Sequence, residues 1–337
     1  MYRPLLTSTA LGLILALASG IGAAADYTAR IGHLESPQQS RHQALEKVAE
    51  RVLERTDGAV EFQLFPQGQL GNQRQMTEGV QLGTLEATVS PAALLGGFNP
   101  AISILDIPFL LPNDEDAAQT IRQGEFGEAL LASFDDRGLK AIALWPNGRK
   151  NFTSNLPLSD IDAFEDQRFR VMDSRILIEQ FAALDASAIA LPFGELYTAL
   201  QTGVVDGQEN PLDTIQRMKF YEVQKYLALS EHGAMEDVAL FNPLWWDSLP
   251  AEYRDIIVEE FQRVIPELRE HKAGAVAAAL TAIREAGMQV REVSEAEKAA
   301  FRRGVTYLRM GREKDAMQAF EVTREYGSER EVAELDA

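Results

Sequence analysis

A polar stretch in the second half of the chain, residues 194–211 (GELYTALQTGVVDGQENP), is rich in hydrogen-bonding side chains. Its last six residues contain Asp-Gly, which predicts a polar turn. Upstream, RFRV predicts a strand that places Arg168 and Arg170 on one face. An arginine binds a carboxylate through two parallel charge-assisted hydrogen bonds, which lysine cannot copy. Together these segments favour a site for an anion, although Arg170 could instead pair with a nearby acid such as Asp173.

A second pair of basic residues, Arg149 and Lys150, follows an Asn-Gly pair at the end of a predicted strand. Loop residues at strand ends often carry function, and open α/β sheets bind ligands at the carboxyl ends of their strands. The alternative is a solvated loop with ordinary positive charges. We therefore treat this pair as a second candidate contribution to the anion site.

Signals for catalysis or metal binding are weak in this sequence. The four histidines show no HExxH spacing, and we find no G-x-S-x-G elbow and no P-loop. The absence of cysteine excludes thiol catalysis, iron–sulfur clusters and cysteine zinc sites. We accordingly predict a binding protein, not an enzyme, with no catalytic residue, no metal and no cofactor.

The N-terminus and the charge balance indicate where such a protein works. Residues 1–25 combine Arg3, an apolar run and a small-residue cleavage pattern before Asp26, which predicts a secretory signal peptide. With 32 basic and 51 acidic residues, the formal net charge is −19, which disfavours nucleic acid and anionic membranes as partners. The acidity fits either a high-salt habitat or an acidic envelope protein kept soluble by self-repulsion.

The pattern of apolar residues predicts the elements that position these groups. Strand, helix and strand are expected over residues 26–36, 40–58 and 59–66, and similar alternation continues along the chain. This alternation indicates an α/β class with a mainly parallel sheet. Turn residues over 147–167 suggest a crossing between two domains, and from Pro250 the chain is expected to be mostly helical, with Pro266 as a kink.

Four segments carry a resemblance to a known family: FPQGQLGNQRQM, LDIPFLLPND, RFRV, and PFGELYTALQTGVVDGQENP followed by KFYEVQKYLALSEH. On these segments the chain resembles the extracytoplasmic solute-binding proteins of TRAP transporters, the DctP-like family. The resemblance implies an α/β, two-domain periplasmic-binding-protein-like fold with a central cleft, crossing inter-domain strands and a long C-terminal helix spanning both domains. The expected domains are residues 26–146 plus 236–275, and 147–235 plus 276–337.

The resemblance also assigns roles to residues of the expected cleft. Arg170 matches the arginine that forms the main salt bridge to the ligand carboxylate, and Asn210 the amide that hydrogen-bonds it. Arg149 matches a second arginine found in many members, and Phe193 an aromatic residue that packs on the ligand. Further positions are expected to tune specificity: His33, Asn72, Gln73, Ser90, Asn147, Met235 and Glu236.

Departures from the family pattern bear on the ligand. Leu34, Asn72 and Pro91 stand where sialic-acid binders carry acidic or amide residues, which disfavours sialate. The resulting order of expectation is a small hydroxy or keto acid or a C4-dicarboxylate, then a uronate-type sugar acid, then an aromatic acid. We expect a periplasmic monomer whose partners are a small carboxylate-bearing ligand and the TRAP membrane subunits, or alternatively a receptor subunit for a sensor.

Overall fold

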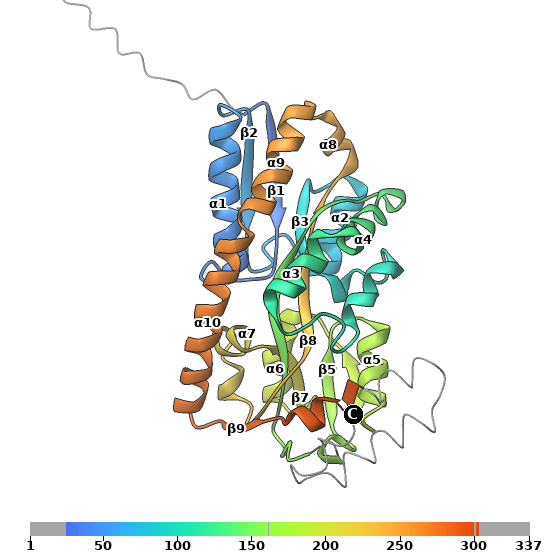
Figure 1. Ribbon diagram of the computed structural model, residues 1–337, viewed down its shortest axis with the longest axis vertical. Coiled ribbons are helices and arrows are strands. Elements are labelled where there is room, and N and C mark those ends of the chain that lie inside the picture. Colours follow the sequence, from blue (N-terminus) through green and yellow to red (C-terminus); the bar gives the residue numbers. More distant parts are fainter. Residues whose placement is uncertain (1–24, 161, 300, 303–337) are drawn as a thin grey trace, which may run out of the picture.

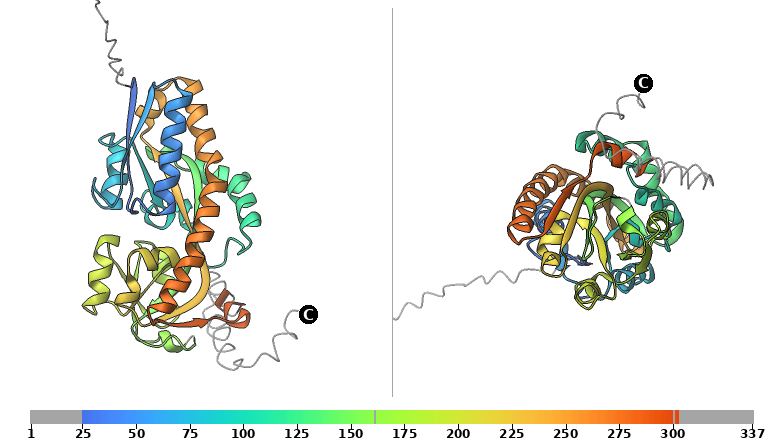
Figure 2. Two further views of the ribbon diagram at one scale, coloured as in Figure 1. Left: turned by 90° about the vertical axis from the view of Figure 1, so that its left-hand side faces the viewer. Right: turned by 90° about the horizontal axis from the view of Figure 1, so that it is seen from below.

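The computed structural model describes residues 25–160, 162–299 and 301–302, so nearly all of the predicted signal peptide lies outside the described residues. The chain forms two lobes stacked along its long axis (Figures 1 and 2). The first lobe contains β1 to β3, and the second contains β5 to β7. None of the helices among the described residues is long and apolar enough to cross a membrane.

The first lobe begins with the predicted strand–helix–strand unit. Strand β1 (Tyr27–Gly32) pairs in parallel with β2 (Val60–Phe65) and β3 (Ala87–Pro91). Helix α1 (Ser40–Arg55) packs its apolar side chains at helical spacing into the core of this lobe. Helices α2 (Gln73–Leu82), α3 (Glu115–Gln123) and α4 (Glu125–Ala132) follow in this lobe. The sequence prediction of this unit is confirmed.

The second lobe repeats the parallel arrangement. Strand β5 (Arg168–Val171) lies between β6 (Ser187–Ala190) and β7 (Gly207–Pro211), and all pairings are parallel. The prediction that DGQENP forms a turn is wrong, because from Gly207 onward it is the fully buried strand β7. Its polar side chains find hydrogen-bonding partners inside the protein, which lets them occupy a buried strand. The helices of this lobe are α5 (Arg175–Ala182), α6 (Leu196–Gln201) and α7 (Leu212–Arg217).

Two long antiparallel strands run through both lobes: β4 (Lys140–Ser154) and β8 (Tyr226–Phe241). They join the sheets in the order β2-β1-β3-β8-β4-β7-β5-β6, so the sheet is mixed. The predicted break at Asn147 is wrong in its local form, because β4 continues past it. The Asn-Gly pair is instead accommodated by a register shift between Pro146 and Arg149, with Gly148 at φ 92°.

A helical segment links the lobes on one side. Helices α8 (Pro243–Ser248) and α9 (Ala251–Arg263) belong to the first lobe, and α10 (Ile265–Glu285) contacts α1 there and α7 in the second lobe (Figure 2). Pro266 lies in the first turn of α10, where its missing N–H leaves no bond unmade. After α10, the short strand β9 (Gln289–Glu292) pairs with β8. The domain boundaries assigned from the resemblance stay a prediction.

Candidate functional site

A cavity lies between the two lobes. It encloses about 390 Å³ of space not filled by atoms, including the part open to solvent. A wider hollow continues outward from it and shares Leu34, Leu94 and Phe193 with its wall. The cavity is lined on the first lobe by Leu34, Glu35, Gln39, Arg41, Pro91 and Leu94, and from β5 onward in sequence by Arg170, Met172, Phe193, Asn210, Thr214 and Met235.

Among the residues that line the cavity, Arg170 on β5 has a buried hydrogen-bond donor without an acceptor in the described part of the chain. Its side chain is buried with 2% exposure, and its Nε donates to the Leu191 carbonyl at 3.0 Å. Within the described part of the chain, its buried Nη2 has no acceptor. Burial lowers the pKa of Arg170 to about 10, against the opposing charge of Glu209, so the group still carries a positive charge at neutral pH. A ligand carboxylate would supply the missing acceptor.

Two charged residues near Arg170 in sequence, Arg168 and Asp173, lie close to other charged partners. Arg168 is exposed and forms a bidentate pair with Asp206, at 3.0 Å from Nε and 2.9 Å from Nη2. Asp173, the alternative partner for Arg170, instead lies 3.9 Å from Arg74 of the first lobe. The guanidinium of Arg170 lies 5.9 Å from the centroid of the Phe193 ring. Arg170 and Phe193 therefore lie together at the cavity wall.

Strand β7 places two polar side chains on opposite faces. Asn210 lines the cavity, and its amide donates to Gln208 on the same face. Glu209 points away and accepts hydrogen bonds from Lys150 Nζ at 2.6 Å and from His232 Nε2 at 2.8 Å. Burial favours the neutral carboxyl, but Lys150 and His232 hold the pKa of Glu209 well below its usual range. The negative charge of Glu209 in turn supports the protonated state of Arg170.

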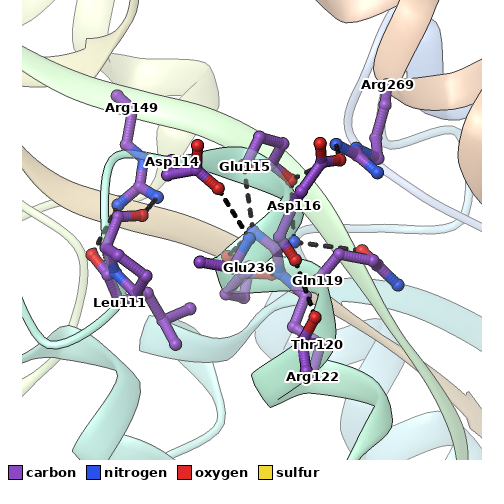
Figure 3. A network of polar contacts seen from close by, with 12 residues as sticks. Leu111, Asp114, Glu115, Asp116, Gln119, Thr120, Arg122, Arg149, Glu236 and Arg269 are labelled. Carbon is purple, nitrogen blue, oxygen red and sulfur yellow. Dashed lines mark hydrogen bonds and ion pairs between the residues drawn. The ribbon is translucent and has the colours of Figure 1, made fainter.

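The adjacent residues Arg149 and Lys150 on β4 also point in different directions. Arg149 donates to the backbone carbonyls of Leu111, at 3.0 Å, and of Pro112, in the loop before α3 (Figure 3). The structure does not bring Arg149 to the cavity of Arg170, and its role as a ligand contact stays a prediction. Lys150 is buried and lies beside that cavity, where its ammonium pairs with Glu209.

The specificity positions inferred from the resemblance divide into three groups. Met235 lines the cavity itself, whereas Asn72 and Gln73 line the outer hollow. Asn72 also caps α2, and the Gln73 amide donates to Thr88 Oγ1 at 3.0 Å.

The remaining positions are buried against protein partners and lie outside the cavity lining. His33 Nε2 lies 3.0 Å from His42 Nδ1, and burial lowers the pKa of His33 to about 3. Asn147 accepts a hydrogen bond from Lys272 at 2.7 Å. Ser90 donates to the adjacent Pro91 carbonyl at 3.2 Å, and Glu236 forms a bidentate pair with Arg122 at 2.7 and 3.0 Å.

Sequence reasoning missed the polar residues on the first-lobe wall, notably Glu35, Gln39 and Arg41. Arg41 is buried and pairs bidentately with Asp237, at 2.7 and 2.6 Å, across 196 positions of sequence. Its position gave a usable signal, because it precedes Ala44 and Leu45 at helical spacing on the apolar face of α1. A charged residue on an apolar face needs a buried partner. Within the described ranges, no group of three or more His, Asp or Glu side chains is arranged to hold a metal ion.

Comparisons with known proteins place this geometry in context. A family model described as bacterial extracellular solute-binding protein, family 7, matches residues 31–309. The 2,3-diketo-L-gulonate-binding periplasmic protein of Escherichia coli strain K12 is 32% identical over 273 residues, covering 81% of this chain and 82% of its own. The C4-dicarboxylate-binding periplasmic protein of Rhodobacter capsulatus is 30% identical over 299 residues, covering 87% and 88%.

A solved structure is more similar in sequence than these relatives. The TRAP periplasmic solute-binding protein from Desulfovibrio salexigens, crystallised with bound orotic acid, is 63% identical to this chain. The two structures superpose with a TM-score of 0.82, and the match covers 88% of this chain and 98% of that one.

Proposed function

Because this chain belongs to family 7 of the bacterial extracellular solute-binding proteins, we propose that it captures a planar heteroaromatic acid of the orotate kind in the periplasm. It would deliver this solute to the membrane subunits of a TRAP transporter. The observation that carries the proposal is the buried Nη2 of Arg170, which has no acceptor among the described residues and lies at the wall of a largely apolar cavity.

The cavity offers two kinds of contact to such a solute, polar donors for its carboxylate and apolar walls for its ring. A buried carboxylate is costly unless it is paired, and the fork of Arg170 together with the Asn210 amide can pair it. The rest of the lining is mainly apolar, and such walls suit the faces of a flat ring better than the many hydroxyls of a sugar acid. The apolar part of the lining comprises Leu34, Pro91, Leu94, Met172, Phe193 and Met235.

Sequence similarity supports the same class of ligand. The protein with bound orotic acid is 63% identical to this chain, whereas the diketogulonate-binding and C4-dicarboxylate-binding relatives are 32% and 30% identical. This difference moves an aromatic acid, which the sequence alone ranked third, to first place. No turnover of the ligand is proposed, and its capture would involve closure of the two lobes over the cleft.

Calorimetric titration tests the proposal. The full sequence would be expressed with its leader, and the protein purified from the periplasm, unfolded to release any bound solute, refolded, and titrated with orotate, succinate and galacturonate. We expect orotate to bind at least about a hundredfold more tightly than the other two acids, a difference of about 2.7 kcal/mol. Equal or tighter binding of succinate or galacturonate would overturn the choice of ligand. The intact mass of the purified chain would also show whether it begins at Asp26.

A further inference from the structure

The first-lobe wall of the cavity carries a buried carboxylate, Glu35, in the loop between β1 and α1. Across the cavity, the second lobe supplies the donors Arg170 and Asn210. Within the described part of the chain, no ion pair joins Glu35 to Arg170, and the two charges lie on opposite lobes that share one cavity. The first-lobe wall of the cavity therefore offers a carboxylate acceptor, beside Arg41, where the second-lobe wall offers the donors of Arg170 and Asn210.

The groups packed around Glu35 leave this end negative. Glu35 lies 3.5 Å from Arg41, which is itself bound bidentately by Asp237. Nearby, Lys272 pairs with Asp213 at 2.7 Å. The cluster thus contains two cations, Arg41 and Lys272, and three carboxylates, Glu35, Asp237 and Asp213, for a net charge of −1.

Glu35 keeps acceptor capacity after these contacts. One of its oxygens accepts the backbone N–H of Arg41 at 3.2 Å, and an ionised carboxylate has about four lone-pair sites in all. Burial favours its neutral form, but Arg41 and Lys272 together lower the pKa of Glu35 below its ordinary value. It is therefore an acceptor and not a donor at neutral pH.

We propose that Glu35 is a specificity-determining residue that accepts N–H groups of the solute at the end opposite its carboxylate. This inference rests on the proposed function and narrows it. A dicarboxylate would bring its second negative charge toward a negative wall, and a carbocyclic acid would leave the acceptor of Glu35 unmet. The solute is therefore a carboxylic acid that carries N–H donors at its far end.

Such donors come in two forms, a neutral ring N–H and a cationic one. Orotate has the first form, whereas a zwitterion such as ectoine has the second. Glu35 can accept hydrogen bonds from either form, so the titrations below include one solute of each kind.

The test compares orotate with benzoate, a carboxylic acid of the same ring size without N–H groups, by calorimetric titration of the full-length product. In the parent we expect orotate to bind at least about a hundredfold more tightly than benzoate, because a site built to bind an N–H rejects an analogue that lacks it. Glu35→Gln should weaken orotate by about tenfold to a hundredfold and leave benzoate within about threefold. Ectoine is titrated in parallel, to test whether the site accepts cationic N–H donors.

The matched control is Glu50→Gln, an exposed acid on α1 that should leave every affinity unchanged. Glu35→Asp retains the charge and serves as a second variant, which should lose less orotate affinity than Glu35→Gln. Equal losses for orotate and benzoate in Glu35→Gln, or parent affinities that do not distinguish the two acids, would overturn the role of Glu35. Failure of the proposed function looks different, since Arg170→Ala would then bind orotate as the parent does.

Discussion

Two arginine-containing regions of this protein differ in how many of their guanidinium donors find acceptors within the protein. In the region drawn in Figure 3, Arg122 bonds Glu236 at 2.7 Å and Glu115 at 2.7 Å, and Arg149 bonds two backbone carbonyls. At the cavity, Arg170 has one backbone acceptor and a buried Nη2 without any among the described residues. A free guanidinium donor at the wall of a cavity, and not the presence of an arginine, distinguishes the region that can bind a solute.

The difference follows from where each arginine lies relative to the two lobes. Arg149 and Arg122 fix the loop and helix of residues 107–123 to the crossing strands β4 and β8, so their donors are used within the protein. Arg170 lies on β5 at the wall between the lobes, where no acceptor among the residues that the structure describes bonds its Nη2. The first region stabilises the fold, and the second leaves interaction capacity for a ligand.

The largest effect on binding is expected from Arg170→Ala. Removing one partner of a desolvated ion pair costs about 3–5 kcal/mol, which is at least about a hundredfold in affinity. Calorimetric titration with orotate measures this loss. Arg168→Ala is the matched control, because it lies two positions away on the same strand but pairs with Asp206 at the surface. Orotate binding by Arg170→Ala within threefold of the parent would remove Arg170 from the site.

The next largest effect should fall on stability, at the carboxylate behind the cavity. Glu209→Gln leaves the buried ammonium of Lys150 without its counter-charge, which should cost about 3 kcal/mol in the free energy of unfolding. Urea denaturation measures this change.

Glu179→Gln provides the control for Glu209→Gln, since Glu179 pairs with Arg175 on the exposed face of α5. Such a pair should contribute less than about 0.5 kcal/mol. If the two variants lost equal stability, the buried network around Glu209 would not be the support that its contacts indicate.

Local patterns predicted the fold where each element buries one regular face. The spacing of Ala44, Leu45, Val48 and Val52 predicted α1, and the alternation over β2 predicted that strand. The patterns failed at Asn147 and at DGQENP, where turn-forming residues lie inside the strands β4 and β7. Those strands are held by partners far away in sequence, which no local window contains.

The site was predictable in part for the same reason. Arg170 was singled out in RFRV, Phe193 and Asn210 in PFGELYTALQTGVVDGQENP, and all three line the cavity. Glu35 and Arg41 were missed because their importance comes from Asp237, nearly two hundred positions later, and from the wall formed when the lobes come together. The different partners of Arg149 and Lys150 could not be predicted from their residue types, because they depend on the register of β4 in the sheet.

The stability of the protein is expected to depend on pH through Glu236, in the region drawn in Figure 3. Burial raises the pKa of Glu236 to about 7 from 4.5, although Arg122 opposes this shift. Between these values the folded state holds a proton that the unfolded state has released, so this group reduces stability as the pH rises from 4.5 to 7. The total is up to about 3 kcal/mol.

Replacement of Glu236 by glutamine removes this titration while retaining a hydrogen-bond acceptor. The stability of Glu236→Gln relative to the parent, measured by urea denaturation, should therefore increase from pH 5 to pH 8. If instead the stability of the variant relative to the parent does not change over this range, Arg122 outweighs burial and Glu236 is ionised in the folded state throughout. Orotate affinity at each pH should not differ between the two proteins by more than about threefold, since Glu236 lies outside the cavity lining.

The smallest effect is expected from Arg149→Ala, and it tests the comparison most directly. The substitution removes hydrogen bonds to the carbonyls of Leu111 and Pro112, which should cost about 1–2 kcal/mol of stability. Orotate affinity should stay within threefold of the parent, because the cavity lining does not include Arg149. A loss of tenfold or more in affinity without a loss of stability would reverse this assignment. Arg149 would then leave the Leu111 loop and reach the solute when the lobes close, as the family resemblance implies.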